Sequence, residues 1–221
     1  MARRFDYELV VIGGGIGGLV ASVTASSLGK KVAIVEKRRL GGNCTSLTCI
    51  PSKALVRAGH VNHLLEKARE YGLGFPGVEA MDKRGVMARV RSVVEAAYAK
   101  DLPETFEAIG IKVISGRACF LDRHHVKVEG TTVSSEKFII AAGTRPLIPK
   151  IPGLEEVPFL TNESVYQLET LPESILILGG GADGLEYACA FRNLGMDVTV
   201  VQRGKRLLPR QERFALEHAE G

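Results

Sequence analysis

The chain contains an internal repeat, and this repeat limits the folds available to it more than any other feature. Residues 9–36 match residues 175–202 without a gap, including four glycines and the Leu-Gly pairs at 28–29 and 194–195. Each copy has a β-branched run, a glycine turn, a helical stretch ending at glycine and a second β-branched run. The repeat predicts an α/β fold with two Rossmann-like dinucleotide-binding units.

Between the two copies the residue pattern predicts further helices and strands. Apolar residues at helical spacing predict helices, and β-branched runs predict strands. The predicted helices are 51–71 and 83–100, and the predicted strands are 111–118, 126–129 and 138–142.

A proline-punctuated connection at 147–153 predicts a domain boundary near residue 150. Residues 1–150 then form one domain, and residues 151–221 form the first half of a second. The second copy ends with fewer strands than such a domain needs to bury its core. We therefore expect either a truncated fragment or a partner that covers the exposed part.

Composition excludes several classes of protein. The hydrophobic fraction is 45% of the 221 residues, the net charge is only +4, and the chain has no Trp. No apolar run reaches the length of a membrane span, and the N-terminus leads into a strand rather than a secretory signal. The scattered basic residues argue against nucleic-acid binding. We expect a cytoplasmic protein with no membrane and no nucleic-acid partner.

The first glycine turn has the pattern Gly13-x-Gly15-x-x-Gly18. Here Gly13 allows a tight turn, Gly15 lets the backbone approach a pyrophosphate, and Gly18 lets helix and strand pack closely. Glu36 ends the second strand at the distance where a carboxylate accepts hydrogen bonds from ribose hydroxyls. These residues predict a dinucleotide site.

The second turn repeats the pattern but lacks the acid. Gly179, Gly181 and Gly184 match the glycines, whereas Gln202 replaces the carboxylate and Arg203 follows it. Further cations follow at Lys205, Arg206 and Arg210. A missing carboxylate and added positive charge favour a 2′-phosphate, hence NADP over NAD.

Cys44 and Cys49 are separated by four residues and precede a predicted helix. Two thiolates are too few for a zinc site, and no spaced Cys or His residues complete one, so we expect no metal. A helix N-terminus lowers the pKa of the Cys49 thiol. A redox pair and two buried structural thiols both remain compatible with the spacing.

The segment Gly41-Gly42-x-Cys44-x4-Cys49-Ile50-Pro51-Ser52-Lys53, together with the first glycine turn and Glu36, resembles the pyridine nucleotide-disulfide oxidoreductases. The likeness extends through residues 139–146 and the second glycine turn to the whole chain. Within the family, the pattern is most like that of mercuric reductases and dihydrolipoamide dehydrogenases.

The resemblance implies that residues 1–150 bind FAD, in a domain with a three-layer ββα-type elaboration. Glu36 would contact the adenosine ribose, Ala118 would lie beside the adenine, and Gly143 would lie near the pyrophosphate. Gly42 and Ala142 would also line the FAD site. The partial second domain would bind NADP or NAD.

The resemblance also implies roles in catalysis. Electrons would pass from NAD(P)H to FAD, then to the Cys44–Cys49 disulfide, and then to a small-molecule disulfide or a metal ion. Cys49 would lie against the flavin, and Cys44 would exchange with substrate. Lys53 would approach the flavin and pair with Glu186.

Some positions depart from the family pattern. If the backbone at Thr48 needs a positive φ, a β-branched residue there is strained. The family's dimerisation domain and catalytic histidine would lie beyond Gly221, so we expect a homodimer of the full-length protein and little turnover from this chain alone. A non-catalytic FAD-binding module is the alternative; a flavin transhydrogenase would not need both thiols.

Overall fold

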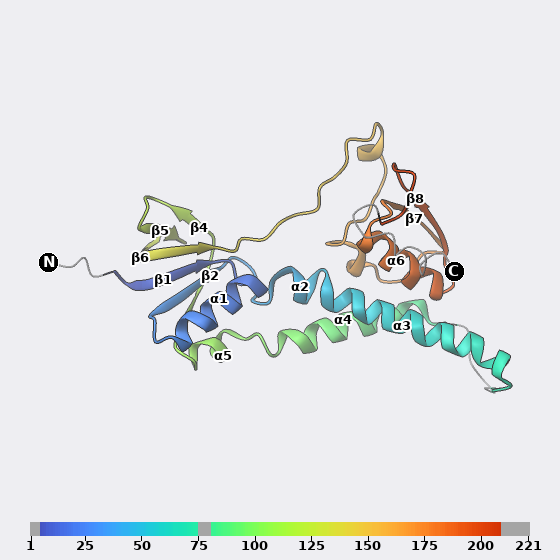
Figure 1. Cartoon of the computed structure of the whole chain (residues 1–221), viewed down its shortest axis with the longest axis horizontal. Helices are drawn as coiled ribbons and strands as arrows, with labels where there is room; N and C mark the ends of the chain where they lie inside the picture. Colours follow the sequence, from blue (N-terminus) through green and yellow to red (C-terminus); the bar gives the residue numbers. More distant parts are fainter. Residues whose placement is uncertain (1–4, 75–80, 209–221) are drawn as a thin grey trace. The chain divides into compact units, whose positions relative to one another are not determined.

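The computed structural model describes residues 5–74 and 81–208 (Figure 1). Its contacts divide the chain into two compact units, each made of two stretches of sequence. Unit 1 comprises Met1–Ile50 and Ser92–Val165, and unit 2 comprises Pro51–Arg91 and Tyr166–Gly221. The domain ranges 1–150 and 151–221 stay a prediction about the organisation of the chain.

The first repeat copy folds as the sequence predicts and begins unit 1. Strand β1 (Tyr7–Ile12) leads through the glycine turn into helix α1 (Ile16–Ser27), which returns to strand β2 (Val32–Glu36). The two strands pair in parallel, with Leu9 opposite Val32. Gly29, just after α1, has φ +75°, a left-handed conformation that glycine adopts at little cost.

A six-stranded sheet forms the centre of unit 1, in the order β3-β2-β1-β6-β5-β4. Its remaining strands are β3 (Ile111–Ser115), β4 (Ala118–Phe120), β5 (His125–Val128) and β6 (Thr131–Ile140). The last strand pairs antiparallel with β5 through its first residues and parallel with β1 from Ser135 onward. One strand thus joins a parallel sheet to an antiparallel meander.

Two of the predicted strand boundaries are wrong. The stretch predicted as one strand at 111–118 is two strands, because Gly116 has φ +138° and breaks the extended backbone. The strand predicted at 138–142 begins at Thr131, since its polar first half is held by pairing with β5. The sequence analysis also missed the short helix α5 (Pro103–Glu107).

Alternate residues of the parallel strands face two different layers. Val11, Ile34 and Ile111 pack with Leu19 of α1 and Phe106 of α5 on one face. On the other face, strand residues pack against the meander; this second cluster consists of Val10, Ala33, Val35, Val126, Val128 and Val133. Helices, parallel sheet and meander form three layers, which confirms the predicted ββα elaboration.

The connecting helices carry the cysteine segment. Helix α2 (Gly42–Ser46) is followed by the long helix α3 (Cys49–Ala68) and a 3₁₀ turn (Arg69–Tyr71). Helix α4 (Lys83–Tyr98) comes next in the sequence. Two further 3₁₀ turns (Leu154–Glu156, Val165–Gln167) precede the second copy. Both predicted helices, 51–71 and 83–100, are confirmed within a few residues.

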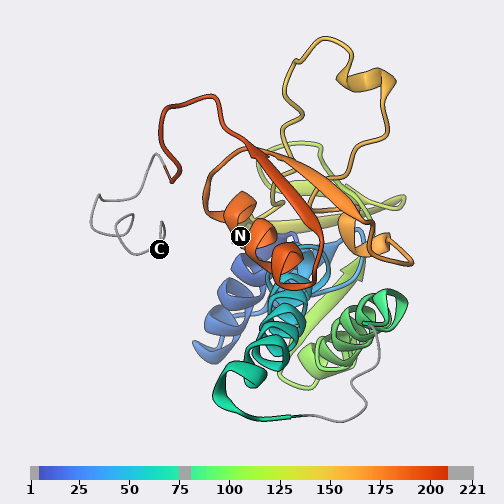
Figure 2. The ribbon, with the colours of Figure 1, turned by 90° about the vertical axis from the view of Figure 1, so that its right-hand side faces the viewer.

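The second repeat copy lies in unit 2 and also folds as predicted. Strand β7 (Ser174–Leu178), helix α6 (Ala182–Asn193) and strand β8 (Asp197–Val201) form a parallel β-α-β unit, with α6 along one face of the two strands (Figure 2). Phe191, Leu194 and Met196 are buried. Gly59 of α3 approaches α6 so closely that a Cβ there would lie 2.8 Å from the Ala190 carbonyl oxygen.

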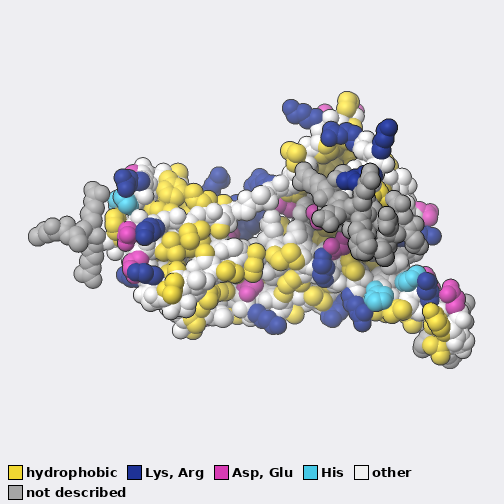
Figure 3. All heavy atoms as spheres, in the orientation of Figure 1, with side chains coloured by type: hydrophobic (Ala, Val, Ile, Leu, Met, Phe, Trp, Pro, Cys, Tyr) yellow, Lys and Arg dark blue, Asp and Glu magenta, His cyan; other side chains and the backbone are white. Residues whose placement is uncertain are grey.

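Hydrophobic side chains also reach the surface of unit 1 (Figure 3). Ile16 and Val20 of α1 are 63% and 58% exposed. Within residues 5–74 and 81–208, none of the helices has both the length and the apolar character needed to span a bilayer.

Candidate functional site

The first glycine turn has the close backbone geometry that its sequence predicts. Gly13 has φ +110°, and its N–H donates to the carbonyl oxygen of Val35 at 2.8 Å. Gly18 lies against the carbonyl group of Gly13, where any Cβ would clash. Gly15 has extended backbone and is the N-cap residue of α1, so the N–H groups of the first helical turn lie directly after it. The turn thus presents backbone donors at a helix N-terminus.

Glu36 is held at this turn by two backbone donors. Its Oε2 atom accepts from the N–H of Gly14 at 2.6 Å, and its Oε1 atom accepts from the N–H of Arg38 at 2.8 Å. The carboxylate, which is only partly buried, is thereby fixed beside the glycine turn, where the sequence places a ribose contact.

A cavity of about 760 Å³ lies in unit 1 at the carboxyl ends of the parallel strands. This volume is within the range of about 300–1,000 Å³ that ligand and cofactor sites have. Most of the cofactor-binding residues predicted for the first domain line it: Gly13, Gly15, Glu36, Gly42, Ala118, Ala142 and Gly143. Gly18 does not line the cavity, because it packs inside the turn.

The structure adds lining residues that the sequence analysis missed. Arg39 stacks on the ring of Tyr98 at 3.5 Å, and its guanidinium also pairs with Glu95 at 3.1 Å. Both Arg39 and Tyr98 line the cavity. These residues are more than fifty positions apart, so no local sequence pattern could have shown that they meet.

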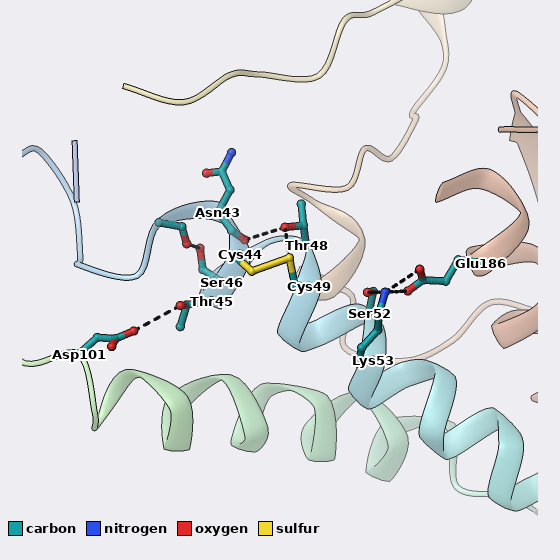
Figure 4. Close-up of a disulfide and its surroundings, with 11 residues drawn as sticks. Asn43, Cys44, Thr45, Ser46, Thr48, Cys49, Ser52, Lys53, Asp101 and Glu186 are labelled. Atoms are coloured by element: carbon teal, nitrogen blue, oxygen red, sulfur yellow. Dashed lines mark hydrogen bonds and ion pairs between the residues drawn. A yellow bond between two sulfur atoms is a disulfide. The ribbon is translucent and has the colours of Figure 1, made fainter. Parts of the chain in front are cut away.

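The two sequence-predicted thiols form a disulfide in the structure (Figure 4). Cys44 lies in α2 and Cys49 is the first residue of α3, with Cα atoms 4.7 Å apart. Cys44 is half-buried and lines the cavity, whereas the exposed Cys49 is not among its lining residues. Thr48 is not one of the described residues with positive φ, so the backbone strain considered for it is not found.

The cysteine segment is tied to its surroundings by polar contacts. Asn43 donates from its side chain to the carbonyl oxygen of Thr144 at 3.3 Å, and Thr45 donates to Asp101 at 3.4 Å. The described part of the chain holds no group of three or more His, Cys, Asp or Glu residues arranged to bind a metal ion.

Lys53 and Glu186 form an ion pair within unit 2 (Figure 4). The ammonium nitrogen of Lys53 lies 2.7 Å from both carboxylate oxygens. Burial would raise the pKa of Glu186, but hydrogen bonds from Lys53 and Ser52 and the charge of Lys53 outweigh it and lower that pKa. The structure thus brings together the two residues that the sequence analysis paired.

Two phenols, that of the buried Tyr166 and that of the half-buried Tyr187, lie beside this pair in unit 2. The hydroxyl oxygens of Tyr166 and Tyr187 are 2.7 Å apart. Burial raises the pKa of both phenols, and both therefore stay protonated at neutral pH. No sequence pattern marked these tyrosines, because each reads as an ordinary apolar position.

The second glycine turn has nearly the same backbone as the first. Gly179 has φ +116°, and its N–H donates to Val201 at 2.9 Å. Gly181 is the N-cap residue of α6 and Gly184 packs against the Gly179 carbonyl, as their counterparts do in the first turn. The structure places Arg203 as an exposed residue just after β8. The predicted cation Arg210 lies outside the described residues.

Comparison with known proteins agrees with this geometry. The family model described as pyridine nucleotide-disulphide oxidoreductase matches residues 7–220. A glutathione reductase from Nostoc sp. is 38% identical over 205 residues, covering 92% of this chain and 44% of the relative. A mercuric reductase from Staphylococcus aureus is 35% identical, covering 93% and 37%.

The similar solved structures include a flavoprotein disulfide reductase. The HOCl-induced flavoprotein disulfide reductase RclA from Escherichia coli is 29% identical, with a TM-score of 0.81. The match covers 97% of this chain and 46% of that structure, so the chain spans less than half the length of these three proteins. The match of the family model over nearly the whole sequence shows that the chain belongs to the pyridine nucleotide-disulphide oxidoreductase family.

Proposed function

We propose that the chain is the FAD-binding and disulfide-bearing part of a flavin-dependent NAD(P)H oxidoreductase. Its substrate would be a small-molecule disulfide or a metal ion. The observation that carries the proposal is that Cys44, half of a disulfide, lines the same cavity as the glycine turn and Glu36. Bound flavin would supply two-electron transfer between the nicotinamide and this disulfide.

The residues of the cavity fit a flavin dinucleotide. The start of α1 offers backbone N–H groups and a positive helix end to a pyrophosphate. Glu36 is oriented by Gly14 and Arg38 to accept from ribose hydroxyls. Gly42 comes so near the turn that a Cβ there would lie 2.6 Å from the Cα of Gly15. A larger residue at position 42 would therefore clash with the backbone of the glycine turn at Gly15.

We assign the two cysteines different tasks. Cys49 begins the 20-residue helix α3, whose positive end stabilises a thiolate at that position. Cys49 would therefore hold the negative charge after reduction. Cys44 would then be the thiol that exchanges with substrate, and Lys53 with Glu186 would act as a charged pair in catalysis.

For the second dinucleotide we propose NADP in preference to NAD. Gln202 occupies the position of the acid, and Arg203, Lys205 and Arg206 follow it. Positive charge without a carboxylate suits the 2′-phosphate that distinguishes NADP. A homodimeric full-length protein, a cytoplasmic location and slow turnover by this chain alone stay predictions.

The proposal is tested by counting thiols. The purified chain is loaded with FAD, reduced anaerobically by light with EDTA as the electron donor, and assayed for thiols before and after reduction. We expect two new thiols per chain, and a long-wavelength thiolate-to-flavin band that Cys49→Ser abolishes. Cys119→Ser removes an exposed free thiol and serves as the matched control.

The same experiment separates the alternative function. If FAD binds and is reduced but no thiols appear, the disulfide takes no electrons and the chain is a non-catalytic FAD-binding module. If FAD does not bind, the cavity assignment is wrong.

A further inference from the structure

Thr48 stands immediately before Cys49, between helices α2 and α3, and its hydroxyl reaches the cysteine sulfur. The Oγ1 atom of Thr48 lies 3.5 Å from the Sγ atom of Cys49, with both side chains in unit 1 (Figure 4). The hydroxyl also donates to the carbonyl oxygen of Asn43 at 3.1 Å. The hydroxyl thus has two partners, a carbonyl and a sulfur.

The Asn43 carbonyl oxygen has its full set of hydrogen bonds without the Thr48 hydroxyl. The Asn43 oxygen already accepts from the backbone N–H groups of Leu47 at 2.8 Å and Thr48 at 2.9 Å. A carbonyl oxygen has two lone pairs, so the two backbone donors fill it. The Thr48 hydroxyl is a third donor on the same atom and can turn away without leaving the carbonyl unpaired.

The other hydroxyls between the two cysteines have different partners. Thr45 donates to the carboxylate of Asp101, and Ser46 donates to the carbonyl oxygen of Gly42 at 3.0 Å within its own helix. Thr48 is therefore well placed to respond to a change of charge on Cys49.

We infer that Thr48 is a positioning residue whose hydroxyl turns from the Asn43 carbonyl to the Cys49 sulfur on reduction and stabilises the thiolate. The inference rests on the proposed function, because it requires the disulfide to be reduced. A thiolate is a charged acceptor and binds a hydroxyl more strongly than a disulfide sulfur does. The reduced state therefore gains a hydrogen bond that the oxidised state has only in weak form.

The consequence is a shift in the thiol–disulfide equilibrium. Two glutathione molecules reduce the pair: the Cys44–Cys49 bond breaks, one glutathione disulfide bond forms, and two electrons pass to the protein sulfurs. Of the two glutathione protons, Cys44 takes one and solvent takes the other when Cys49 remains a thiolate. A donor to that thiolate favours the reduced side.

The experiment measures the equilibrium constant for reduction of the purified chain in glutathione buffers of fixed pH. Thr48→Val keeps the shape of the side chain but removes the hydroxyl. We expect it to lower the equilibrium constant roughly tenfold, the effect of losing one hydrogen bond to a charged group. Thr48→Ser keeps the donor and should stay within about twofold of the wild type.

Thr45→Val is the matched control, since it makes the same chemical change one residue from Cys44 at a hydroxyl bound to Asp101. It should alter thermal stability without moving the equilibrium. Equal constants for wild type and Thr48→Val would overturn the inference while leaving the redox disulfide intact. If reduced glutathione does not open the Cys44–Cys49 disulfide and oxidised glutathione does not re-form it, both the inference and the proposed function are overturned.

Discussion

Gln202 contacts Gly180 in the second repeat copy as Glu36 contacts Gly14 in the first. The Oε1 atom of Gln202 accepts from the N–H of Gly180 at 3.1 Å, and the Oε2 atom of Glu36 accepts from the N–H of Gly14 at 2.6 Å. An amide oxygen and a carboxylate oxygen thus support the same turn. The two turns share their backbone geometry, and the side chain that supports the turn is charged in the first copy and neutral in the second.

This difference predicts a change of dinucleotide preference in Gln202→Glu. The new carboxylate keeps the contact with Gly180 but repels a 2′-phosphate and accepts from ribose hydroxyls. The ratio of the NADPH to the NADH dissociation constant should rise about tenfold. Fluorescence titration of each nucleotide measures it, with Gln167→Glu as a control for added charge. An equal change for both nucleotides would show that Gln202 does not select between them.

The Lys53–Glu186 pair should contribute little to stability. The Lys53 side chain is 66% exposed, and ion pairs of this kind contribute about 0.2–1 kcal/mol. A double-mutant cycle with Lys53→Met and Glu186→Gln should give a coupling free energy of unfolding in this range. The Lys83–Glu173 pair, also at 2.7 Å in unit 2, is the comparison. A coupling above about 2 kcal/mol would mean that the pair is structural.

Gly59→Ala should destabilise unit 2. The added methyl group would lie 2.8 Å from the carbonyl oxygen of Ala190, which is backbone and cannot rotate away. The cost should be about 1–3 kcal/mol, the usual range for overpacking a close contact. Urea unfolding measures it. Gly17→Ala, with no atom within 4 Å of its new Cβ, should instead stabilise the chain by about 0.5–1 kcal/mol.

Asp6 should make stability depend on pH in the acid range. The side chain of Ser134 donates to its carboxylate at 2.7 Å and the backbone of Ser134 does so at 2.8 Å, which lowers the pKa of Asp6. A carboxyl group with a lowered folded-state pKa stabilises the fold above its unfolded-state pKa of about 3.9. This stabilisation is lost as the pH falls through the folded-state pKa.

Ser134→Ala removes one of the two donors and raises that pKa toward its usual value. Because Asp6 is exposed, the variant should lose only about 0.5 kcal/mol of unfolding free energy at pH 7. The loss should be the same at pH 5 and smaller at pH 3. Thr132→Ala, an exposed change on the same strand, is the control. A difference that grows as the pH falls would contradict this assignment.

Local patterns in the sequence were sufficient for the two repeat copies. Each has its glycines, its β-branched strands and its helix end within about thirty residues, so the short-range preferences of the chain specify the turn and the helix. Both copies were predicted, and both fold as parallel β-α-β units. The pairing of Cys44 with Cys49 was expected only from the resemblance to the family, because the spacing alone was equally compatible with two structural thiols.

Tertiary structure determined where the meander strand β6 begins and that Arg39 and Tyr98 line the cavity together. The strand from Thr131 is polar at its start and extended only because β5 lies beside it. Arg39 meets Tyr98 and Glu95 only after the chain has folded around the sheet. Propensities and motifs act over a few residues, whereas the contacts of Arg39 join segments more than fifty positions apart. The residue types therefore specified the two glycine turns, and the packing of the sheet specified which side chains share the cavity.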